Sequence, residues 1–126
     1  MKAAKAADRL ISTLQKAMDA SDERKTQLEA SLTATHGPSS MYKAARAWTR
    51  FERYMFMQEA TVISRDHLPQ AASIRRFLEH HAKDGDNVPH HLYKGLVFCR
   101  QWVDIPIPPE DCLLASFKSM PKLNED

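Results

Sequence analysis

The stretch that decides the fold is MYKAARAWTRFERYMFM, residues 41–57. Its apolar and basic residues recur every three or four positions, which is the spacing of one side of an α-helix. The apolar side consists of Ala44, Trp48, Phe51 and Met55, and the basic side consists of Lys43, Arg46, Arg50 and Arg53. This pattern predicts a helix that buries one side in a core and presents a row of cations on the other.

Composition favours one small helical domain. The chain has 126 residues, of which 43% are hydrophobic and 27% are charged, and only three are glycine. Sheets joined by tight turns usually need more glycine, so an all-α fold is expected. The net charge of +2 is too small to argue for nucleic-acid binding by itself. Residues 37–103 are nevertheless basic, with ten Lys and Arg against six Asp and Glu.

Turn signals divide the chain into five expected helices. They cover about residues 3–33, 39–60, 69–83, 87–103 and 110–118. The first is long, polar and rich in alanine, and we expect it to lie at the periphery of the fold. Its middle, residues 19–27, is nearly all polar and Ser21 with Arg24 is no capping box, which leaves open whether the helix breaks there or runs through solvent. The expected organisation is an N-terminal helical extension over residues 1–36, a helical domain over residues 37–120 and an acidic tail over residues 121–126.

No constellation of residues indicates an enzyme or a metal site. The His-His pairs at 80–81 and 90–91 are neighbours on helices, and neighbouring side chains point about 100° apart, so neither pair suits one ion. The sequence has no Gly-rich phosphate loop and no specific catalytic signature. We therefore expect no catalytic residue, metal or cofactor.

Cysteine usage and hydropathy indicate an intracellular protein, nuclear or cytoplasmic. Cys99 and Cys112 each lie in an apolar run, which is typical of buried free thiols in a reducing compartment. We expect neither a secretory signal nor a membrane span, because no apolar run is long enough for either.

The basic residues are the strongest functional signal in the residues themselves. Besides the row in residues 41–57, the expected helices carry Arg75, Arg76, Lys94 and Arg100. Phosphate contacts need such side chains on rigid elements. The charges leave open a simpler interpretation, a solvated helix face with Glu52 and Glu59 as partial partners.

Four landmarks follow one another along residues 40–118. They are WTRFERY at 48–54, Pro69, SIRRFL at 73–78, and a helix carrying Leu92, Leu96 and Trp102. Their order resembles the N-terminal, SAM-like core-binding domain of tyrosine recombinases and phage-type integrases. The second, catalytic domain of that family, with its arginine-rich pocket and tyrosine nucleophile, has no counterpart in these residues.

The resemblance implies a fold and a function. The fold would be an all-α, SAM-like orthogonal bundle of four to five helices, to which the pattern adds the long N-terminal helix. The function would be non-enzymatic binding of double-stranded DNA by a recombinase-type domain, as in a truncated mobile-element product. Carried over to this sequence, the residues expected to contact duplex phosphates are Lys43, Arg46, Arg50, Arg53, Arg75 and Arg76.

Two rival interpretations stay open. The chain could be a helical protein–protein interaction module, which would self-associate through residues 3–33 and use exposed apolar residues such as Phe56, Met57 and Val62. It could also be a fragment that folds poorly and has no function of its own.

Overall fold

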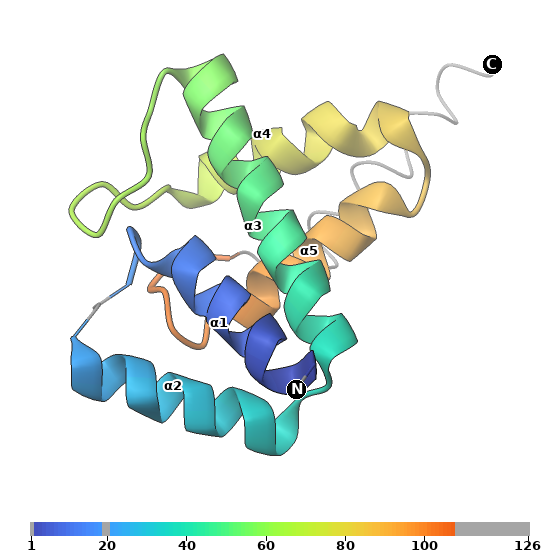
Figure 1. The fold of residues 1–126 in the computed structure, drawn as a ribbon. Coiled ribbons are helices and arrows are strands. Elements are labelled where there is room, and N and C mark those ends of the chain that lie inside the picture. Colours follow the sequence, from blue (N-terminus) through green and yellow to red (C-terminus); the bar gives the residue numbers. More distant parts are fainter. Residues whose placement is uncertain (1, 19–20, 108–126) are drawn as a thin grey trace, which may run out of the picture.

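Five α-helices make up the fold in the computed structural model, which describes residues 2–18 and 21–107 (Figure 1). They are α1 (Lys2–Leu14), α2 (Asp22–Thr35), α3 (Pro38–Glu59), α4 (Ala71–His81) and α5 (Val88–Cys99). A short 3-10 helix, η1 (Ala82–Asp84), follows α4. The described residues contain no β-strand, only an isolated bridge between Ser64 and His67. The all-α class predicted from the sequence is confirmed.

The N-terminal segment forms two helices, so one continuous helix over residues 3–33 is wrong and the break that its polar middle left open is the observed form. α1 ends at Leu14, and α2 begins after Ser21. The Ser21 hydroxyl oxygen accepts a hydrogen bond of 3.2 Å from the backbone N–H of Arg24. A serine at the N-cap satisfies this donor without the glutamate of a full capping box.

The helix α1 lies alongside α3 and belongs to the core, not to its periphery (Figure 1). Its fully buried side chains are Ala6, Ala7, Leu10 and Leu14. Leu28 and Leu32 of α2 join the same core, so the segment before Gly37 is packed into the domain that the sequence placed after it. These apolar side chains are buried within one chain. The predicted self-association through residues 3–33 would therefore have to use the polar, solvent-facing sides of α1 and α2.

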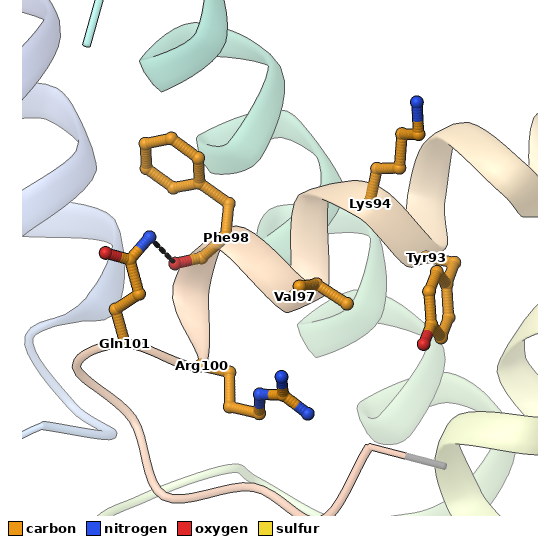
Figure 2. Close-up of a pocket in the computed structure, with 6 residues that line it drawn as sticks. All are labelled: Tyr93, Lys94, Val97, Phe98, Arg100 and Gln101. Atoms are coloured by element: carbon orange, nitrogen blue, oxygen red, sulfur yellow. Dashed lines mark hydrogen bonds between the residues drawn. The ribbon is translucent and has the colours of Figure 1, made fainter. Parts of the chain in front are cut away.

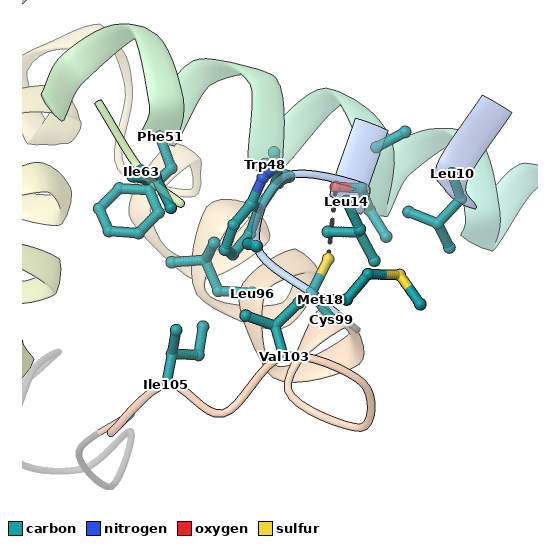
Figure 3. Close-up of a cluster of buried hydrophobic side chains, with 14 of the residues drawn as sticks. Leu10, Leu14, Met18, Trp48, Phe51, Ile63, Leu96, Cys99, Val103 and Ile105 are labelled. Carbon is teal, nitrogen blue, oxygen red and sulfur yellow. Dashed lines mark hydrogen bonds between the residues drawn. The ribbon is translucent and has the colours of Figure 1, made fainter. Parts of the chain in front are cut away.

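Aromatic rings fill the centre of the core. Trp48 and Phe51 are fully buried, as the sequence predicted, and their ring centroids lie 5.8 Å apart. Phe77 of α4 packs against Phe51 at 4.9 Å between centroids, which joins α3 to α4. Figure 3 shows Leu14 and Met18 on one side of Trp48 and Leu96 of α5 on another.

Cys99 is a buried free thiol at the end of α5, as expected from its apolar run. Burial raises the pKa of this thiol to about 12, because the thiolate would lose its hydration. Its sulfur lies 3.9 Å from the carbonyl oxygen of Ala44 (Figure 3). Cys112, the expected helix over residues 110–118 and the acidic tail over residues 121–126 lie outside the described residues.

None of the helices that the structure describes is long and apolar enough to cross a membrane.

Candidate nucleic-acid interface

A groove of about 690 Å³ runs between α3 and α5. Its floor is apolar and its edges are basic. The lining residues are Ser40, Lys43, Ala44, Arg46, Ala47 and Arg50 from α3, and Val88, His91, Leu92, Lys94, Gly95 and Phe98 from α5. No Asp or Glu is among them, so the lining has a single sign of charge.

Gly95 of α5 and Ala47 of α3 lie in the floor of the groove, where the two helices approach closely. A Cβ atom built on Gly95 would lie only 2.4 Å from the Cβ of Ala47, far inside van der Waals contact. The approach therefore requires glycine on α5 and a small residue on α3. The backbone of α5 therefore packs closely against α3 at Gly95, and the longer side chains on either side of this contact form the walls of the groove.

Three of the six residues predicted to contact DNA meet at this groove. They are Lys43, Arg46 and Arg50. Lys94, on the facing edge, adds a fourth cation that the predicted set did not contain. Among the described residues, Lys43, Arg46 and Lys94 form neither a hydrogen bond nor an ion pair through their side chains. Their charges are therefore available to an anionic partner.

Arg50 lies near the turn that follows α4. The pKa of the Asp84 carboxyl is lowered mainly by its hydrogen bond with His81, and the nearby charges of Lys83 and Arg50 add to the effect. The His81 Nδ1 lies 2.7 Å from the Asp84 carboxylate, so His81 is the closest partner of that anion. The Arg50 side chain is exposed and lines the edge of the groove.

Arg53 lies one turn beyond Arg50 and is exposed, but it does not line the groove. It extends the basic row of α3 toward the end of that helix. Phe56, Met57 and Val62, predicted as an assembly surface, are also exposed and lie near the same end.

The two predicted cations of α4 are not part of the groove, because carboxylates engage them elsewhere. Arg76 donates hydrogen bonds to both oxygens of Glu59, at 2.9 and 3.1 Å, and a third to the Ser73 hydroxyl at 3.1 Å. These bonds from Arg76 lower the pKa of the Glu59 carboxyl to about 2, and the hydroxyl of Ser73 adds to the effect. Arg75 pairs with Glu79 at 3.4 Å along the outer face of α4. The Arg76–Glu59 contact fastens α4 to the end of α3.

Arg100, the other cation noted on the fourth expected helix, is not among the residues that line the groove. It lines a second hollow of about 610 Å³ on α5, together with Tyr93 and Gln101, and this hollow shares Lys94 and Phe98 with the groove. Figure 2 shows the Lys94 and Arg100 side chains pointing to opposite sides of α5. The hollow is shaped partly by Gln101, whose amide donates to the Phe98 carbonyl at 3.2 Å.

The histidines are engaged with their neighbours in the structure. The rings of His80 and His81 meet edge to face at 5.0 Å, and His80 also packs on Tyr54. Within residues 2–18 and 21–107, no three His, Cys, Asp or Glu side chains gather in a way that could hold a metal ion.

Comparison with known proteins gives no relative: no family model, curated protein or solved structure matches this chain.

Proposed function

We propose that this chain is a non-enzymatic DNA-binding domain that holds duplex phosphates along the groove between α3 and α5. One observation carries the proposal: Lys43, Arg46, Arg50 and Lys94 converge from two helices on a groove lined by no carboxylate. The sequence resemblance to recombinase core-binding domains agrees with this function. Membership of that family remains a prediction from the sequence.

The electrostatics of the groove suit a polyanion better than a single anion. A row of cations along one helix follows a line, and α3 rises about 1.5 Å per residue, so Lys43 to Arg53 span about 15 Å. Phosphates of one DNA strand follow one another at about 3.4 Å of axial rise, so the row matches the axial length of about four base pairs. Lys94 approaches the same line from the facing helix.

Removing the groove cations should abolish binding while the fold persists. Fluorescence anisotropy with a labelled duplex would compare the wild type with the variant Arg46→Ala/Arg50→Ala/Lys94→Ala. All three side chains are exposed, so the core is unaffected. At an ionic strength near 0.1 M each lost phosphate contact should weaken binding by roughly tenfold. We expect the triple variant to bind several hundredfold more weakly.

Two single-charge controls make the experiment specific to the groove. Arg75→Ala removes a cation that Glu79 already engages, and Arg9→Ala removes an exposed arginine of α1. Both controls should change the affinity by less than about threefold. Equal losses in the controls and in single groove variants would show that only overall charge matters. Absence of binding to duplex at about 50 mM salt would refute the proposed function outright.

A further inference from the structure

The exposed row of α3 continues past its last cation into an apolar pair. Helical periodicity places Lys43, Arg46, Arg50, Arg53 and Met57 along one side of the helix, three or four residues apart. Phe56 lies beside Met57, and their exposed fractions are 61% and 66%. Single exposed apolar residues are ordinary, but two adjacent large ones at the end of a cationic row form a surface that suggests a ligand.

Neither carboxylate of α3 interrupts this row. Glu52 lies on the other side of the helix, where burial raises the pKa of its carboxyl although the charge of Lys16 partly opposes the effect. Glu59 is held by Arg76 and Ser73 through hydrogen bonds of 2.9 to 3.1 Å. Glu59 is engaged by Arg76 and Ser73, and Glu52 lies off the row, so neither carboxylate of α3 stands on the path of a polyanion that follows the row.

We propose that Phe56 and Met57 form an apolar wedge that enters a base step of the DNA bound along the row. The inference rests on the proposed function. Met57 lies about 6 Å beyond Arg53 along the helix axis, which is within two base steps of the phosphate that Arg53 would contact. Phenylalanine and methionine are among the side chains that unstack base steps when cations beside them hold the backbone.

The wedge also predicts which DNA the protein prefers. Unstacking costs least at flexible pyrimidine–purine steps and at mismatches, so these sites should bind more tightly than stiff A-tracts. The preference would come from deformability, because apolar side chains form no hydrogen bonds with base edges.

The experiment joins two readouts on one labelled duplex of about 25 base pairs with a central TA step. Energy transfer between the duplex ends reports bending, and 2-aminopurine at the step reports unstacking. We expect the wild-type protein to bend the duplex by about 20–90° and to raise the 2-aminopurine signal. The variant Phe56→Ala/Met57→Ala should lose both signals and bind about fivefold or more weakly, with an unchanged salt dependence.

Gln58→Ala is the matched control, because it truncates an exposed polar side chain on the same turn. It should behave as the wild type. Wild-type binding without bending or unstacking would overturn the wedge and leave the proposed function intact, whereas absence of binding would remove both. If the double variant keeps both DNA signals but loses self-association or a protein partner, the pair belongs to a protein interface and the inference is wrong.

Discussion

The helix crossing beneath the groove makes a quantitative prediction. The Cβ that Gly95→Ala introduces would lie 2.4 Å from the Ala47 Cβ. Carbon atoms in contact lie about 3.5–4.0 Å apart, so α3 and α5 would have to separate by more than about 1 Å. Such overpacking costs about 1–3 kcal/mol, which the better helix propensity of alanine offsets by about 1 kcal/mol.

A double-mutant cycle isolates the contact from these opposing effects. Ala47→Gly alone should cost about 2 kcal/mol, from helix propensity and from the loss of one buried methyl group. In the double variant, the methyl group that Gly95→Ala introduces occupies the space that the Ala47 methyl group vacated, so the strain disappears. We therefore expect the two changes to couple by about 1–3 kcal/mol in the stabilising direction.

Urea unfolding followed by circular dichroism measures all four corners of the cycle. Gly37→Ala is the control, since a Cβ at Gly37 meets nothing within 4 Å. It should change the free energy of unfolding by less than about 0.5 kcal/mol. Additivity of the Gly95 and Ala47 substitutions within about 0.5 kcal/mol would refute the close crossing and, with it, the shape of the groove floor.

Three further predictions concern the rest of the fold. Because the pKa of Glu59 lies at about 2 in the folded chain against 4.5 ordinarily, its stabilisation is present above pH 4.5 and is lost as the pH falls toward 2. Glu59→Gln should then lower the free energy of unfolding near pH 7 by only about 1 kcal/mol, since solvent screens the half-exposed Arg76. Urea unfolding near pH 7 and near pH 2 measures this loss, and an equal loss at both pH values would contradict the prediction. Ala60 ends α3 in the left-handed conformation at φ 51°, which glycine adopts without the steric cost of a Cβ atom. Ala60→Gly should therefore raise the midpoint of thermal unfolding by the equivalent of about 1 kcal/mol, and a lower midpoint would contradict this prediction. In a Cys112→Ser background, iodoacetamide should modify Cys99 only after urea unfolds the chain, and equal rates in both states would show that the thiol is accessible.

The two faces of α3 are the part of the molecule that the sequence predicts best. Their residues alternate with helical spacing along the helix, and burial follows that spacing at Trp48 and Phe51 while Arg46 and Arg50 stay exposed. A local pattern of this length is decided within one helix, so no knowledge of its neighbours is needed.

The sequence leaves the break between α1 and α2 open because its signal is weak. The polar residues around it are compatible with a helix that continues through solvent, and the capping serine, Ser21, lacks the glutamate that would have marked it. The burial of Ala6 and Ala7 was missed for a related reason, since alanine carries little hydrophobic signal and becomes informative only when a second helix approaches closely.

The composition of the groove depends on contacts between distant residues. Lys94 reaches the basic row only because Gly95 lets α5 approach Ala47, which lies 48 positions earlier in the chain. Conversely, Arg76 is removed from the candidate surface by Glu59, 17 positions away. Neither contact leaves a periodic pattern in the sequence. The sequence therefore identifies the cations but does not show which of them line the groove and which are paired with carboxylates.

The salt dependence of duplex binding tests the central claim most directly. Five exposed cations face the proposed path of the DNA, namely Lys43, Arg46, Arg50, Arg53 and Lys94. If each neutralises one phosphate, the logarithm of the association constant should fall against the logarithm of salt concentration with a slope of about −4.5. Arg46→Ala/Arg50→Ala should reduce the slope to about −2.7, whereas Arg75→Ala should leave it unchanged. A slope near zero, or the same slope in the groove variant as in the wild type, would contradict phosphate binding along the groove.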